Sequence, residues 1–385
     1  MRFWGEGGSS LYPDSDIFNF SFVSSAITRA GVGEFDAITL NKALANKSVS
    51  VRPAISDETQ SINGSCSPKD IETMMELTYL YFTSPREDRA AFNGEIERMY
   101  SFYTNREANP QVGYNDTTRV LLYGNSLRVA PMRRENLKQV DYELIMQIYK
   151  ERFSDANGFK MVIVGNISVD ELRPLLCKYI ASLPSKGRVE SFADTYPRVR
   201  DVEETHLFYK EANTPSALVN IYYTFARPFT PKSDLELDFL SRVLSIAYTE
   251  SIREEKGGTY GVSVSYNLNK HTTPNSLIKI SFRPDPSRYN ELIPLIYKEI
   301  ENIAQDGVKA TSMDKVRSYL KKSYDQNIID NGYWEYVIYN YLRYNIDYDT
   351  DFESVLNSVS SEDVQQTAKD MLSQHRRIEI TMISK

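Results

Sequence analysis

Cysteine and histidine are scarce in this chain. Its 385 residues include two cysteines, Cys66 and Cys177, and three widely separated histidines, His206, His271 and His375. No CxxC, HxxEH or HxxxH spacing occurs among them. A disulfide framework and a cysteine zinc site are therefore excluded, and a self-contained histidine zinc site is not expected.

Long apolar runs and clusters of basic residues are also missing. No stretch reaches the roughly 18 apolar residues that a membrane-spanning helix needs, so no membrane span is expected. The formal net charge is −7, which argues against nucleic acid as the main partner. Hydrophobic residues make up 41% of the chain, and its length exceeds what one average core accommodates. These totals predict two globular domains.

The sequence repeats itself at a nearly constant offset. "YPDSD" at 12–16 matches "TPKSD" at 230–234, and "LKQVDYELIMQIYKERF" at 137–153 matches "LNSVSSEDVQQTAKDML" at 356–372. Each match alone is weak, but offsets of 218 and 219 residues over such a distance indicate a duplication.

The two copies are predicted to be residues 1–190 and 191–385, joined within the polar stretch 182–204, which contains proline and glycine. Each copy shows a strand, a helix, further strands, long amphipathic helices, and a last helix that leads into a closing strand. The closing strands are "FKMVIVG" and "RIEITMI". This order predicts an α+β fold of two homologous domains, each a mostly antiparallel sheet with helices packed on one face.

Two details of the second copy are also predicted. Ser233 and Glu236 have the S-x-x-E spacing of a capping box at a helix start. "HLFYK" at 206–210 reads as a strand whose counterpart in the first copy would lie before residue 1. Because an open sheet edge is unfavourable, we expect the first domain to lack its N-terminal strand and the chain to be part of a longer polypeptide, or to receive that strand from elsewhere.

"SIREEKGGTYGVSVSY" at 251–266 joins a helical pattern to an alternating strand. Gly257 and Gly258 permit the backbone conformation that ends a helix. Arg253 offers a planar fork of donors, and the phenol of Tyr260 can stabilise a developing oxyanion. The simpler interpretation is that Arg253 is a solvated charge at the helix end and Tyr260 an ordinary strand aromatic.

This corner, R-E-E-K-G-G-T-Y, resembles the C-terminal half of the pitrilysin/insulinase family of zinc metallopeptidases, which carry an inverted HxxEH motif. "GGSSLYPDSD" with "SPKDIETMMELTYLYFTSPREDRAAF", and "FKMVIVGNISVDELRPLLCKYIASLP", resemble other parts of family domains. The resemblance covers almost the whole chain. It implies a metallopeptidase LuxS/MPP-like fold in which two halves, each of two such domains, enclose a chamber; the first half carries zinc and the second holds the substrate.

The resemblance also implies roles for single residues. Arg253, with Gly257 and Gly258, would bind a backbone carbonyl of the peptide, and Tyr260 would support the oxyanion formed when zinc-bound water attacks. HxxEH is absent, and the region 14–30 contains neither histidine nor glutamate. No metal site is therefore expected in this chain, which alone should be inactive, and zinc is expected in an N-terminal half or partner subunit.

Three functions remain open at this point. The chain is expected to be the substrate-binding half of a zinc endopeptidase, with a separate zinc-free subunit and a non-catalytic scaffold as alternatives. Its expected partners are an HxxEH-bearing half or subunit and a peptide. The resemblance suggests a bacterial periplasm or cell envelope location.

Two further segments carry weaker predictions. Glu95 and Glu97 lie where the metal-bearing half would carry its third ligand, and without histidines they are interpreted as a solvated helix face. The tyrosine-rich segment 331–349 could line a peptide-binding chamber, although aromatics at helical spacing more often belong to a core.

Overall fold

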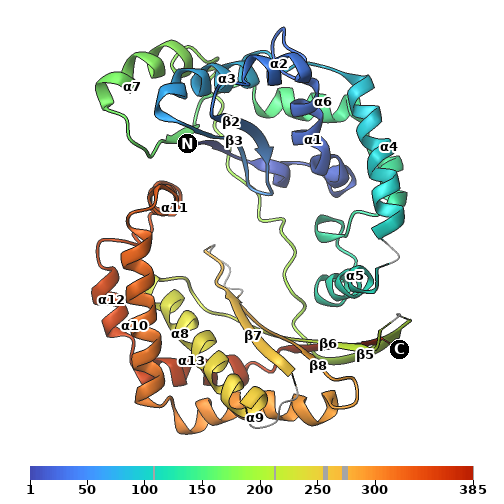
Figure 1. Ribbon diagram of the computed structural model, residues 1–385, viewed down its shortest axis with the longest axis vertical. Coiled ribbons are helices and arrows are strands. Elements are labelled where there is room, and N and C mark those ends of the chain that lie inside the picture. Colours follow the sequence, from blue (N-terminus) through green and yellow to red (C-terminus); the bar gives the residue numbers. More distant parts are fainter. Residues whose placement is uncertain (107–108, 212–213, 255–258, 271–275, 385) are drawn as a thin grey trace. The chain divides into compact units, whose positions relative to one another are not determined.

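The computed structural model describes residues 1–106, 109–211, 214–254, 259–270 and 276–384, without the side chains of residues 110, 253, 254, 259 and 260. The chain divides into two compact units (Figure 1). The first comprises Met1–Ala108 and Asn125–Pro197, and the second comprises Asn109–Gly124 and Arg198–Lys385. The boundary between homologous domains at residues 190 and 191 remains our proposal.

The first unit is built on a four-stranded antiparallel sheet of order β2-β3-β1-β4. Phe3, Val51 and Ile62 point from this sheet into a core shared with the helices, where Ile27 and Ile145 are fully buried. Its elements are β1 (Arg2–Glu6), α1 (Ile17–Ala30), α2 (Ala37–Ala43), β2 (Val49–Ile55), β3 (Thr59–Cys66), α3 (Ile71–Thr83), α4 (Arg89–Arg106), α6 (Tyr142–Arg152), β4 (Lys160–Val162) and α7 (Val169–Leu175).

The second unit is built on a five-stranded sheet of order β5-β9-β6-β8-β7, in which only the β5–β9 pair is parallel. Its elements are α5 (Pro110–Tyr123), β5 (Glu203–Lys210), β6 (Ser216–Phe225), α8 (Pro231–Tyr248), the π-helical turn η7 (Thr249–Glu254), β7 (Thr259–Asn267), β8 (Ser276–Pro284), α9 (Tyr289–Asp306), α10 (Ala310–Asn327), α11 (Asn331–Tyr344), α12 (Phe352–Ser358), α13 (Ser361–Ser373) and β9 (Arg377–Ser384).

The two sheets have the same strand order once β5 is set aside. β2, β3, β1 and β4 correspond in order to β7, β8, β6 and β9. β5 contains the predicted "HLFYK" strand and pairs with the outer side of β9. In the described part of the chain, no strand of the first sheet stands in the place of β5. The predicted α+β class with mostly antiparallel sheets is confirmed.

Helices lie on both faces of the second sheet (Figure 1). One face packs against α8, α9 and α13, where Ile221, Ile278 and Ile280 are fully buried. α5 lies on the other face, and the hydroxyl of its buried Tyr114 donates a hydrogen bond to the carbonyl of Ile380, at 3.1 Å. The predicted packing of helices on one face of the sheet therefore holds for α8, α9 and α13, whereas α5, which comes from earlier in the chain, covers the other face.

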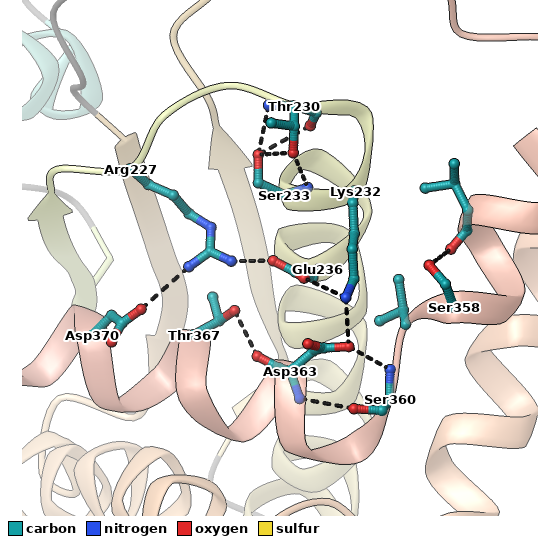
Figure 2. Close-up of polar contacts among 12 residues, drawn as sticks. Arg227, Thr230, Lys232, Ser233, Glu236, Ser358, Ser360, Asp363, Thr367 and Asp370 are labelled. Carbon is teal, nitrogen blue, oxygen red and sulfur yellow. Dashed lines mark hydrogen bonds and ion pairs between the residues drawn. The ribbon is translucent and has the colours of Figure 1, made fainter. Parts of the chain in front are cut away.

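The predicted capping box at Ser233 and Glu236 is wrong. α8 begins one turn earlier, because Thr230 is the N-cap and its hydroxyl accepts a hydrogen bond from the Ser233 amide, at 2.9 Å. Pro231 takes the first helical position, where its missing N–H costs nothing. Glu236 instead forms ion pairs with Arg227 and with Lys232 (Figure 2).

Candidate substrate-binding corner

The end of α8 is held firmly where the predicted corner begins. Tyr248 is fully buried, and its hydroxyl donates to the carbonyl of Ile296 at 3.2 Å. The hydroxyl of Ser251 donates to the carbonyl of Ala247 at 2.9 Å, and Ile252 is fully buried in the core. The helix widens here into the π-helical turn η7, a rare geometry that is frequent at functional sites.

β7 is the last strand of its sheet in the described part of the chain, and it pairs with β8. The ladder is irregular between Thr259 and Val262 and regular from Val262 to Asn267. Val264 and Tyr266 face the helices, whereas Ser265 is exposed. Such an edge offers backbone donors and acceptors to an extended peptide.

The structure describes only part of the four predicted site residues. The backbone of Arg253 belongs to η7, and that of Tyr260 belongs to β7. Their side chains are not described, and Gly257 and Gly258 lie outside the described residues. The roles of these four residues therefore remain a proposal.

A pocket of about 510 Å³ lies beside β7, between that strand, α8 and α10. The Nε atom of Arg242 donates to a carboxylate oxygen of Asp238 at 2.7 Å, and the guanidinium lies 4.3 Å from the centroid of the Tyr319 ring. Tyr266 and Lys315 also line the pocket. The pocket thus offers donors, acceptors and an aromatic face next to the edge strand.

Two partly buried carboxylates lie along this side of α8. Burial raises the pKa of the Asp234 carboxyl to about 6, against the opposing effects of the Lys270 ammonium and a hydrogen bond with Tyr266. Burial also raises the pKa of Asp238, and Arg242 opposes that rise. Sequence reasoning missed this pair, because the groups that surround the two carboxyls come from β7, α10 and the segment after α11.

Replacing Asp234 by Asn is expected to stabilise the chain at high pH. The unfolded carboxyl ionises near 3.8 and the folded one near 6. The resulting cost to folding is absent below about pH 4, grows between pH 4 and 6, and is complete above pH 6, at about 3 kcal/mol for two pKa units. The groups that act on or are affected by Asp234 are Lys270, Tyr266, Asp238 and Tyr348.

Urea unfolding should therefore find Asp234→Asn more stable than the native chain by about 3 kcal/mol at pH 8, because the raised pKa of Asp234 already includes the Lys270 attraction, and nearly equal at pH 4. Asp314→Asn, on the exposed face of α10, is the control and should change stability by less than about 0.5 kcal/mol at either pH. A gain for Asp234→Asn that is the same at both pH values would contradict this explanation.

The interpretation of Glu95 and Glu97 as a solvated face is correct for Glu97 and wrong for Glu95. α4 packs against α1, so the Glu95 side chain is 7% exposed. Its carboxylate accepts from Arg29 Nε at 2.9 Å and also pairs with Arg98.

The described residues do not fit a zinc ion. No group of three or more His, Cys, Asp or Glu side chains among them could hold a metal. Glu95, at the position that the resemblance assigns to a third ligand in the metal-bearing half, is instead bound by the guanidinium groups of Arg29 and Arg98. Nor is any described helix both long enough and apolar enough to cross a membrane.

The tyrosine-rich segment is only in part a core element. In α11, Val337 and Asn340 are buried, as the core interpretation predicts. Tyr336 is 46% exposed and Tyr341 is 54% exposed. A role for these rings in lining a chamber remains a prediction.

Comparison with protein families gives one match inside this chain. Residues 139–320 match the model described as the peptidase M16 inactive domain. The probable zinc protease PqqL of Haemophilus influenzae is 22% identical over 340 residues, which are 86% of this chain and 36% of the relative. The chain thus spans about a third of the length of that relative.

Solved structures share the fold. The periplasmic protease PqqL from Escherichia coli superposes with a TM-score of 0.85 at 18% identity, over 100% of this chain and 42% of that chain. The first half of the same protein superposes with a TM-score of 0.77 at 12% identity, over 99% of this chain and 86% of that one. The fold alone therefore does not separate the two halves. The resemblance predicted from the sequence is confirmed.

Proposed function

We propose that this chain is the zinc-free, substrate-binding half of a peptidase of the M16 family, and that it degrades peptides only together with a half that carries HxxEH. The observation that carries this proposal is the match of residues 139–320 to the inactive domain of that family. The zinc is expected in the other half, because the described residues of this chain do not fit it.

The corner between η7 and β7 is proposed to hold the peptide at the reacting bond. Arg253 would donate to a backbone carbonyl of the peptide through its planar guanidinium, and Gly257 and Gly258 would let the chain turn closely beside it. Tyr260 would donate a hydrogen bond to the oxyanion that forms as the peptide bond is attacked. The rigid end of α8 and the open edge of β7 support this assignment.

The experiment that tests the function is reconstitution. A quenched fluorescent peptide is incubated with this chain, with the HxxEH-bearing half from the same source, and with both. Hydrolysis is expected only from the pair or from a polypeptide that contains both halves. Full activity of the HxxEH half alone would contradict a substrate-binding role for this chain.

The separate-subunit and scaffold alternatives are tested by the size of the natural product. An antibody against this chain should detect a band of at least twice the 44.2 kDa of the chain if both halves are one polypeptide. A band near 44 kDa with a co-purifying HxxEH protein would indicate a two-chain peptidase. A 44 kDa band without such a partner would indicate a scaffold. A periplasmic location is proposed because the Escherichia coli structure is that of a periplasmic protease.

Replacing Arg253 by Met is expected to lower kcat/KM of the complete enzyme about tenfold, by raising KM and lowering kcat together. This is the effect of losing one hydrogen bond from a charged donor, about 1.5 kcal/mol. Arg253→Lys keeps the charge but not the planar fork, so it should recover only part of the activity. Steady-state kinetics with one peptide measure both variants, and unchanged kinetics of Arg253→Met would remove this role.

A further inference from the structure

Lys270 follows β7 closely, and its ammonium group lies among four aromatic rings. Its Nζ atom is 5.0 Å from the centroid of the Tyr336 ring and 5.1 Å from that of Tyr348. The rings of Phe229 and Tyr344 are each 5.7 Å away. A cation within about 6 Å of a ring centroid is attracted by the ring quadrupole. These four rings are called the cage below.

The cage also presents two oxygen acceptors to the ammonium. Lys270 Nζ donates to Asn340 Oδ1 at 2.6 Å and to the Tyr336 hydroxyl at 3.2 Å. Asn340 is 1% exposed, and its Nδ2 atom donates to the Tyr336 carbonyl at 2.7 Å, which leaves Oδ1 directed at the cage. A buried amide oxygen held in this way, within a ring of aromatic faces, suits a cation.

Neutral groups hold Lys270 in the cage. Among the described residues no carboxylate forms an ion pair with its Nζ, and the carboxylate that interacts with it over a longer range is Asp234. Tyr336 is the exposed ring of the cage, and Phe229, Tyr344 and Tyr348 are half-buried. Because the attraction of about 0.5–2 kcal/mol for each ring is open to any alkylammonium group, another such group can compete for the same place. Tyr336 is 46% exposed, so the cage is open to the surface of the second unit.

We propose that the cage binds the ammonium group of a lysine side chain of the peptide substrate, and that Lys270 occupies it in the free chain as an internal competitor. This proposal rests on the proposed function, because the ligand is a peptide held by the same unit. The nine residues of β7 span roughly 30 Å at about 3.3 Å each. An extended peptide paired with this edge would run from Tyr260 towards the cage.

The first test uses the full 385-residue chain and two fluorescent extended peptides that differ only in lysine or norleucine. Lys270→Met empties the cage of its charge, so it should bind the lysine peptide about tenfold more tightly than the native chain does, while affinity for the norleucine peptide is unchanged. Adding Tyr336→Leu, which removes a half-exposed ring and one acceptor, should abolish most of that gain. Fluorescence anisotropy measures all three.

Lys279→Met is the matched control. Lys279 lies on β8, the strand next to β7, and its Nζ atom is 5.7 Å from the ring centroid of Tyr222 on β6, outside the cage. It should leave the affinity for the lysine peptide at the native value. Equal affinity of Lys270→Met for lysine and norleucine peptides would overturn the proposal and leave Lys270 as a structural anchor.

A second test needs no substitution. Tetramethylammonium competes for aromatic cages but does not react with acetic anhydride. It should speed acetylation of Lys270 in the native chain about threefold or more over the same concentration of sodium chloride, without affecting Lys279. An unchanged acetylation rate of Lys270 would overturn the proposal that another cation can displace Lys270 from the cage. Neither test involves the catalytic half, so failure here would leave the reconstitution result standing, and failure of reconstitution would leave these binding results standing.

Discussion

A Tyr260→Phe substitution in the complete enzyme is expected to lower kcat about 100-fold while leaving the affinity for peptide almost unchanged. The phenol would donate its hydrogen bond to an oxyanion that exists only after the peptide bond has been attacked. Loss of a single donor of this kind typically lowers turnover by about 10²–10³-fold. Steady-state and single-turnover kinetics of the native and Phe enzymes measure the effect on the chemical step.

Tyr209→Phe is the matched control for this prediction. Tyr209 lies on β5, at the opposite edge of the same sheet, and it is 57% exposed. Loss of its hydroxyl should leave kcat and KM unchanged. If Tyr260→Phe also shows native kinetics, Tyr260 is an ordinary strand aromatic and the proposed catalytic role is lost. A rise in KM alone would move Tyr260 from oxyanion support to peptide binding.

Local sequence patterns were sufficient to predict most of the fold. Alternation in "VSVSY" follows from a strand with one face on the helices, and Val264 and Tyr266 do face them. The duplicated segments predicted the same order of elements along the chain in both copies, and "HLFYK" at 206–210 was predicted as one more strand of the second copy, where β5 lies. Alternation depends on neighbouring residues and duplication on a comparison within the chain, so one sequence is enough to show both.

The two predictions that failed did so for different reasons. Ser233 and Glu236 have the spacing of a capping box, but Thr230, directly before Pro231, offers a competing local pattern and caps the helix instead. Glu95 has the composition of a solvated face, yet the contact between α4 and α1 buries it against Arg29. No local pattern contains these tertiary contacts.

The candidate site likewise combines a motif that the sequence shows and a cluster that forms only in the folded chain. The corner at Arg253 and Tyr260 is a short contiguous motif, so the family resemblance could identify it. The cage joins residues from before α8, after β7 and around α11. The only sequence signal for it was the high density of tyrosine in the segment 331–349. A single sequence does not show that Lys270 belongs with those rings.

Replacing Arg227 by Met is expected to destabilise the second unit by about 3 kcal/mol. Arg227 pairs with Glu236, and its Nη1 atom lies 3.5 Å from a carboxylate oxygen of Asp370 on α13 (Figure 2). The side chains of Arg227 and Glu236 are 15% and 9% exposed. Removing one partner of such a pair leaves a buried charge with poor compensation, which typically costs about 3–5 kcal/mol. The remaining partner of Glu236 is the more exposed Lys232, at 3.6 Å.

Hydrogen exchange measured by mass spectrometry can localise this loss. Amides of α8 and α13 should exchange about 100-fold faster in Arg227→Met, while those of α1 and α6 in the first unit should keep their native rates. Lys321→Met is the control, because its pairs with Asp325 and Glu353 are exposed and should contribute less than about 1 kcal/mol. The double variant Arg227→Met with Glu236→Leu removes both charges and should recover most of the lost protection, since the cost arises from the unpaired carboxylate. If the double variant is as unstable as the single one, packing of the Arg227 side chain, and not its charge, holds α8 against α13.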